Sequence, residues 1–231
     1  MAFALAFRKE ASEDIFPTSM GELRIAFLGH ASLMMSVAGK TIHVDPVSAE
    51  ADYGKLPKAD LVLITHEHGD HCDPSALRLI RKPETEVISS ASSKAKWPEA
   101  VALRNGESRT AAGFAVEAVP AYNVKHMRAP GVPYHPKGTG NGYVLTVGDT
   151  RILIAGDTEN VPEIKSIAGI AIAFLPMDLP YTMSPEMVAD AARAIRPKVL
   201  YPYHYDDTDP QRLVDLLKGE KDIEVRIRSL R

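Results

Sequence analysis

Cysteine is nearly absent from this 231-residue chain, which contains only Cys72. A single cysteine excludes a disulfide within the chain and is typical of proteins from a reducing compartment. Long apolar runs are also missing, and no segment approaches the ~20 residues that a membrane-spanning helix needs. Residues 1–7 are apolar, but no positive charge precedes them and the run is short for a signal-peptide core. We therefore expect a cytoplasmic protein with no membrane partner.

An excess of charge of either sign is missing too. The chain has 27 Lys and Arg residues against 30 Asp and Glu residues, which gives a net charge of -3. This balance provides no electrostatic attraction to nucleic acid or to an anionic membrane. The expected partner is therefore a small-molecule substrate, and the sequence leaves the oligomeric state open, a homo-oligomer included.

The apolar pattern predicts many short strands and a few helices. Strands are predicted at 23–28, 32–37, 41–44, 61–64, 86–89, 101–103, 114–119, 143–147, 151–155, 170–175 and 198–201, with a tight turn at 38–39. Helices are predicted at 73–80, between the cap Ser184 and the stop at Pro197, and at 210–218. Strand-rich halves that are each followed by helices predict an α+β fold, in which two sheets pack together with helices outside.

The densest chemical feature is a histidine run, H-x-H-x-D-H, formed by His66, His68, Asp70 and His71. It holds three of the eight histidines and directly follows the strand predicted at 61–64, whose rigid end can hold ligands in place. Imidazole nitrogens with a carboxylate oxygen are donors that zinc and its neighbours favour. Crowded imidazoles repel one another once protonated, so packing does not explain the run. We predict that it binds a metal.

Two further candidate ligands follow predicted strands later in the chain. Asp157 comes after strand 151–155, and His204 comes after strand 198–201. Asp157 could otherwise form a turn, and His204 could be a packing residue in a tyrosine-rich stretch, but together with the run they complete a donor set. Cys72 is instead interpreted as a small buried side chain, because oxygen and imidazole donors already suffice.

The histidine run resembles the signature of the metallo-β-lactamase superfamily. The segments 28–31, 44–46, 155–158 and 201–205 fit the same pattern, and the resemblance runs from about residue 22 to about residue 228. The chain is most similar to the small metal-dependent hydrolases that include ascorbate-6-phosphate lactonases and the phospholipase D acting on N-acyl phosphatidylethanolamine. This resemblance implies a four-layer αββα sandwich, with residues 1–231 as one metallo-hydrolase domain in which 1–21 is an N-terminal extension.

The resemblance also implies how the donors would be shared between two ions. The first site would hold His66 and His68, with Asp157 bridging to the second. The second site would hold Asp70, His71, Asp157 and His204. The cofactor expected is Zn2+, as one or two ions, with Mn2+ as an alternative.

The sequence departs from the family pattern at Asn123. A histidine is expected one strand before Asp157, but Asn123 stands there. The amide could donate its oxygen, which suits manganese better than zinc; His126 or His135 could reach in from the following loop; or the first site could be weak and one metal be held tightly. We favour a loop histidine or a single tight metal over the amide.

The segment 123–142 is predicted to be a long loop near the substrate. Loops of this length are usually functional, and glycines at 131, 138, 140 and 142 would give it the mobility of a lid. Its basic side chains suit an anionic substrate. We expect His135 and Lys137 to reach the cleft, whereas Lys125 and Arg128 are as compatible with a solvated basic face.

His30 and Tyr181 are the remaining substrate-binding candidates. His30 lies near the expected metal edge and could contact substrate or be a buried structural histidine. Tyr181 could donate a hydrogen bond to a substrate oxygen, or it could simply pack. Asp45, which ends a predicted strand, is expected to orient a histidine ligand, and His43 is expected to be structural.

These features predict a metal-dependent hydrolase. A metal-activated hydroxide would attack a small, anionic ester, lactone or phosphodiester, and Asp70 would act as the catalytic residue that orients the nucleophile. The alternative, motivated by Asn123, is a non-catalytic metal-binding remnant or sensor with the same fold. A di-iron oxidoreductase is disfavoured, because the nitrogen-rich run suits zinc better than redox iron.

Overall fold

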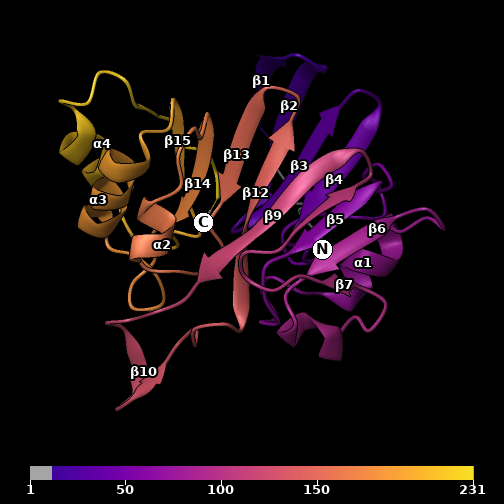
Figure 1. The fold of residues 1–231 in the computed structure, drawn as a ribbon, viewed down its shortest axis with the longest axis horizontal. Helices are drawn as coiled ribbons and strands as arrows, with labels where there is room; N and C mark the ends of the chain where they lie inside the picture. Colours follow the sequence, from indigo (N-terminus) through magenta and orange to yellow (C-terminus); the bar gives the residue numbers. More distant parts are fainter. Residues whose placement is uncertain (1–11, 231) are drawn as a thin grey trace, which may run out of the picture.

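Two seven-stranded sheets face each other in the computed structural model, which describes residues 12–230 (Figure 1). The first sheet runs in chain order through β1 (Glu13–Thr18), β2 (Gly21–Gly29), β3 (Ser32–Val37), β4 (Lys40–Val44), β5 (Leu61–Ile64), β6 (Glu86–Ser89) and β7 (Val101–Ala102). The second has the order β16 (Glu224–Val225), β15 (Val199–Tyr203), β14 (Ile172–Pro176), β13 (Thr150–Ile154), β12 (Gly140–Val147), β9 (Phe114–Ala121) and β8 (Ser108–Ala111).

The main core lies between the sheets. Along β2 the buried side chains Leu23, Ile25 and Phe27 recur at every second position, so one face of the strand points inward. They belong to the same apolar cluster as Phe114 and Val116 of β9, on the opposite sheet. Alternation in the sequence therefore decides which face of each sheet is buried.

Helices cover the two outer faces. The second sheet is flanked by α2 (Pro162–Lys165), α3 (Pro185–Ile195) and α4 (Gln211–Leu217), and the first by α1 (Pro74–Ile80) (Figure 1). The predicted cap Ser184 is confirmed, because it accepts from the amide of Met187 at 3.3 Å. Asp73, where a helix is predicted to begin, also acts as a cap and accepts from the amide of Ser75 at 2.7 Å. The predicted four-layer αββα sandwich is confirmed.

Parallel pairing brings the functional residues to one edge. β4 pairs with β5, and β13, β14 and β15 pair in succession, all in parallel. The carboxyl ends of parallel neighbours meet at the same edge of a sheet, and the segments that follow them carry the candidate ligands.

Some elements were not predicted. β1 falls within the expected extension 1–21 and pairs antiparallel with β2. The segment 123–142 is not a plain loop: β10 (Met127–Ala129) and β11 (Val132–Pro133) form a hairpin that projects from the body (Figure 1), and β12 already starts at Gly140. Glycines 140 and 142 therefore lie in a strand and do not loosen a lid. The apolar residues 1–7 lie outside the described residues, and within 12–230 no helix is both long and apolar enough to cross a membrane.

Candidate metal centre

The histidine run leaves the carboxyl end of β5 and turns its donors towards each other. His66 and His71 are buried and His68 is half-buried, whereas the Asp70 side chain is 52% exposed. The ring nitrogens of His66 and His68 approach to 3.0 Å. Three groups of donors lie close enough together to hold an ion: His66, His68 and His135; His66, His71 and Asp157; and His30, Asp70, His71 and His204.

Asp157 lies between the histidine groups, where a bridging carboxylate would have to be. Its Oδ2 is 3.2 Å from His135 Nε2, 3.7 Å from His66 Nε2 and 3.3 Å from His204 Nε2. Its Oδ1 is 3.4 Å from His71 Nε2. The structure therefore brings together the donors that the sequence placed far apart, and Asp157 touches both sets.

Gly156 allows Asp157 to occupy this position. Its φ of +64° lies in the left-handed region, and a Cβ there would come within 2.6 Å of the Asn141 carbonyl oxygen. Any other residue would be both strained and in contact with backbone, so glycine is needed to turn the chain from β13 into the centre.

A buried carboxylate holds the rear of the centre. Asp45, with a φ of 41°, receives the ring Nδ1–H of His71 at 2.8 Å and the Thr65 hydroxyl at 2.6 Å. The Thr65 oxygen in turn lies 3.1 Å from His66 Nδ1. These bonds leave the Nε2 atoms of His66 and His71 facing Asp157. The expectation that Asp45 orients a histidine agrees with this geometry, and His43, whose Nε2 lies 3.0 Å from the Pro57 carbonyl, is buried and structural.

Asn123 does not face the centre; it orients His135, which does. The amide oxygen of Asn123 accepts from the His135 backbone N–H at 2.8 Å and from its ring Nδ1 at 2.7 Å. The Asn123 amide nitrogen donates to the Tyr181 carbonyl at 2.8 Å. Of the three sequence alternatives, the geometry matches the loop histidine, and it is His135; His126 instead turns its ring towards Glu159 at 2.9 Å.

Glu159 anchors the start of this loop. Its buried carboxylate accepts from the backbone N–H groups of Val124, Lys125 and His126 at 2.7 to 3.1 Å and lies 3.3 Å from the Asn123 amide nitrogen. These bonds hold the pKa of Glu159 below its usual range, although burial alone would raise it. The carboxylate thus fixes the loop that carries Asn123.

The charges of the buried groups are strongly coupled. Burial alone would lower the pKa of His71, but the carboxylates of Asp157 and Asp45 raise it well above its usual value. Burial would raise the pKa of Asp157, yet His204 and His71 hold it well below the usual range. Burial and the charge of His71 keep the pKa of His66 low. His71 must therefore give up a proton before it can serve as a metal ligand.

The donor set fits a divalent ion. Among the described residues, the buried His71 Nε2, His204 Nε2 and Asp157 Oδ1 have no hydrogen-bond partner, and unpartnered buried polar atoms are costly unless they coordinate something. Ligands placed tetrahedrally around zinc are about 3.3 Å apart, close to the Asp157 separations. Cys72 is buried in an apolar cluster, and burial raises its pKa to about 11, so it remains a thiol outside the donor set.

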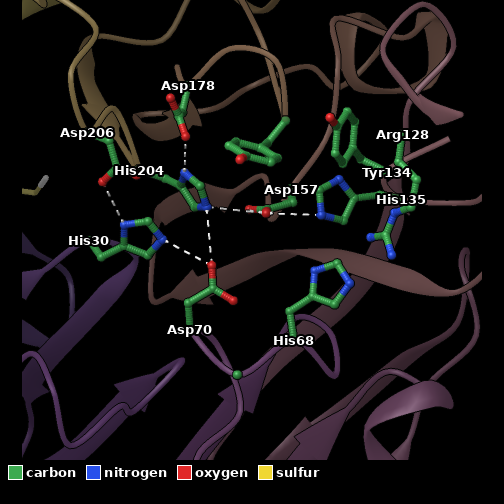
Figure 2. A pocket seen from close by; sticks show the side chains of 12 residues that line it. His30, His68, Asp70, Arg128, Tyr134, His135, Asp157, Asp178, His204 and Asp206 are labelled. Carbon is green, nitrogen blue, oxygen red and sulfur yellow. Dashed lines mark ion pairs between the residues drawn. The ribbon is translucent and has the colours of Figure 1, made fainter.

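A cavity of about 530 Å³ opens in front of these groups. It is lined by His30, His68, Gly69, Asp70, Arg128, Tyr134, His135, Asp157, Asp178, Tyr181, His204 and Asp206, most of which Figure 2 shows. His30, Tyr181 and His135, which the sequence offered as substrate-binding candidates, all line this cavity. His30 contacts Asp70 at 3.4 Å and Asp206 at 3.3 Å. Lys137 was expected in the cleft, but its ammonium group pairs with Glu163 at 2.7 Å and does not line the cavity.

Sequence reasoning missed Asp178, Asp206 and Tyr134 as cavity residues. Asp178 follows β14, and the strand-end rule that pointed to Asp157 also applies to it. Asp206 lies two residues beyond His204, with a φ of 33°. Tyr134 follows the unpredicted hairpin, and no sequence signal marked it.

A family model shows which protein family the chain belongs to. The model described as a beta-lactamase superfamily domain matches residues 24–204, which include the histidine run, Asp157 and His204. The chain belongs to the metallo-β-lactamase superfamily. The resemblance predicted from the motifs is thereby confirmed.

Several relatives of this superfamily member span nearly all of it. A UPF0173 metal-dependent hydrolase of Thermococcus kodakarensis is 30% identical over 202 residues, covering 81% of this chain and 87% of the relative. A crystal structure of a putative metal-dependent hydrolase from Parabacteroides distasonis is 48% identical with a TM-score of 0.91, and covers 96% of this chain and 100% of that chain. Igni18, a metallo hydrolase from Ignicoccus hospitalis, is 24% identical with a TM-score of 0.75, covers 90% of this chain and 95% of that one, and supports the fold.

Proposed function

We propose that this protein is a metal-dependent hydrolase that holds one or two divalent ions and acts on a small, anionic ester, lactone or phosphodiester. One observation supports this proposal most strongly. Buried atoms of His71, His204 and Asp157 that have no hydrogen-bond partner lie together beside an open cavity. Zinc is the metal best matched by so many imidazoles, and Mn2+ is the alternative. Relatives named as metal-dependent hydrolases support the reaction class. We further propose a cytoplasmic enzyme with a small-molecule substrate.

Asp70 is well placed to orient the attacking water. Its carboxylate is exposed to the cavity and contacts His30 at 3.4 Å. Burial would raise the pKa of Asp70, but the contact with the His30 ring and the charge of His71 hold it well below its usual range. A bound divalent ion would supply an activated water and polarise the substrate carbonyl or phosphoryl group. Asp70, ionised at neutral pH, would orient the attacking water by accepting a hydrogen bond from it.

A non-catalytic metal-binding protein is the alternative function. This alternative was considered because Asn123 stands where the family pattern has a histidine ligand. His135 stands at 3.2 Å from Asp157, so the first group of donors has three histidines. That observation favours the enzyme.

Metal content and turnover test the proposal together. Protein purified without added metal is expected to carry zinc or manganese and to hydrolyse a 4-nitrophenyl ester or bis(4-nitrophenyl) phosphate, and chelation should abolish turnover. His71→Ala should lose metal measured by mass spectrometry, and Asp70→Ala should lower kcat by on the order of 100-fold or more.

A matched control is Asp222→Ala, which removes an exposed carboxylate that pairs with Arg196 at 2.7 Å, away from the cavity. It should keep full activity and metal content. Undiminished turnover of His71→Ala after complete chelation would exclude the proposed chemistry, and bound metal without any hydrolysis would favour the non-catalytic alternative.

A further inference from the structure

The cavity in front of Asp157 has two ends of opposite character. Figure 2 shows Asp178, Asp206 and His30 on one side of Asp157 and Arg128 with Tyr134 on the other. Two carboxylates at the first end repel an anion. Arg128 is the one Arg or Lys among the residues that line the cavity, within the described chain 12–230.

Arg128 is also free to bind a ligand. It lies on β10 of the projecting hairpin, and among residues 12–230 no carboxylate lies within ion-pair distance of it, whereas Lys137 of the same segment is paired with Glu163. Its guanidinium carbon is 5.7 Å from the centroid of the Tyr134 ring, so a cation–π contact helps to hold it while leaving N–H groups available. A planar guanidinium fork matches a carboxylate or phosphate group.

Two tyrosines give this end a flat, partly apolar wall. The rings of Tyr134 and Tyr181 meet edge to face, with centroids 5.0 Å apart, and Tyr181 is 45% exposed. Such rings present faces against which a flat apolar group can pack.

The wall is tied to the metal centre by hydrogen bonds. Asn123, which orients His135, donates to the Tyr181 carbonyl at 2.8 Å, and His126 Nδ1 lies 3.0 Å from the Thr182 carbonyl. The distance between this wall and Asp157 is therefore fixed by the same residue that positions a donor. Because these hydrogen bonds already hold the wall in place, the cavity can select a substrate without a loop closing over it.

We propose that Arg128, Tyr134 and Tyr181 form the subsite that selects the substrate: an ester or phosphodiester that carries a carboxylate or phosphate group, next to a flat apolar group, at a distance from the bond that is cut. This inference rests on the proposed function and assigns its substrate class. The scissile bond lies at Asp70 and Asp157, the remote anion lies at Arg128, and the carboxylates of Asp178 and Asp206 make the opposite end less favourable for that anion. The cavity volume of about 530 Å³ suits a molecule of this size.

The kinetic test compares two matched esters on the metal-loaded enzyme. One is mono(4-nitrophenyl) terephthalate, which has a remote carboxylate on a flat benzene ring, and the other is its neutral methyl ester. Arg128→Gln is expected to raise KM for the acid by on the order of tenfold or more, while kcat and the KM for the methyl ester change little. Arg128→Lys keeps the positive charge but loses the planar guanidinium fork, so its KM for the acid should lie between those of the wild type and Arg128→Gln. Arg109→Gln removes an exposed arginine outside the cavity as the control.

Equilibrium binding separates this proposal from the proposed function. Phenylphosphonate and phenylacetate are titrated calorimetrically into the wild-type protein and the Arg128→Gln variant; weaker binding of both to the variant, by on the order of tenfold, supports the subsite, and a loss for only one shows which anion it takes. If neither ester is hydrolysed, the proposed function fails, while the binding result still decides the subsite. An equal KM shift for both esters, or unchanged affinity for both anions, would overturn it.

Discussion

Asn123 fixes the orientation of His135 through both its backbone and its ring. One amide oxygen accepts from the His135 N–H and from its Nδ1, so the ring is held with Nε2 towards Asp157. Partners of this kind set the tautomer of a histidine ligand and its direction. The amide thus acts on the metal centre only through another residue.

We expect Asn123→Ala to weaken metal binding at the His66, His68 and His135 group by about 10- to 100-fold, because His135 loses the partner that orients it. Competition with a chromogenic chelator measures the affinity, and metal analysis after dialysis should show up to one equivalent less. Asn160→Ala, which removes an exposed amide paired with Asp190 at 2.7 Å, serves as the control. Equal chelator competition by the wild type and Asn123→Ala would remove the positioning role.

Three of the donors that the sequence predicted follow a predicted strand closely. His66, Asp157 and His204 come at most three residues after the ends of β5, β13 and β15. Predicting the strands therefore also predicted that these residues lie at the sheet edge where the strands end. His135 could not be placed in this way, because it follows a long segment whose path depends on tertiary hydrogen bonds. The sequence offered His135 as one of several alternatives, beside His126, the Asn123 amide and a single tight metal, and the bonds to Asn123 turn the His135 ring towards Asp157.

The hairpin β10–β11 shows why local patterns failed for that segment. Its strands have only three and two residues, too few to display an alternating pattern. The loop start is held instead by Glu159, far along the chain, through bonds to three backbone amides. No sequence window near the hairpin contains that information.

Asp60, just before β5, ties together β4 and the segment between α1 and β6. Its carboxylate accepts from Lys82 at 2.8 Å, from the backbone of Thr41 at 2.9 Å and from Lys40 at 3.1 Å. Burial alone would raise its pKa, but these bonds lower it to about 2, against an ordinary value of 3.8. Because the folded pKa is depressed, the stabilisation is present above about pH 4 and is lost as the pH falls towards 2.

Asp60→Asn should therefore be less stable than the wild type at pH 5 by about 2 kcal/mol, and the difference should shrink towards zero near pH 2. Urea unfolding of both proteins across this range measures it, and subtraction removes the titration of groups that the two share. A stability difference that stays constant from pH 5 to pH 2 would mean that the Asp60 charge is not responsible.

The two halves of the molecule are joined at the edge formed by β1. Asp14 on β1 accepts from Arg228 Nη2 at 2.7 Å to each oxygen and from Arg226 Nη1 at 3.2 Å, and it also accepts from the Tyr201 hydroxyl of β15. A strand of the first sheet is thereby linked to the second sheet and to the end of the described chain. β1 falls in the expected extension because the family resemblance begins only at about residue 22, and its proline and charged residues are tolerated because it is an edge strand.

Asp14→Ala is expected to lower the free energy of unfolding by about 2 to 3 kcal/mol, because the partly buried Arg228 loses its carboxylate partner and the Tyr201 hydroxyl its acceptor, while Arg226 keeps only Glu224. The neighbouring Glu13→Ala removes an exposed partner of Arg24, with a side chain 39% exposed, and should cost less than about 0.5 kcal/mol. Urea unfolding at neutral pH measures the free energy of unfolding of both variants. Since Asp14 closes the sandwich at β1, away from the cavity residues, the metal content of folded Asp14→Ala should equal that of the wild type. Equal losses for the two variants would show instead that the link between the sheets contributes no more than a surface ion pair.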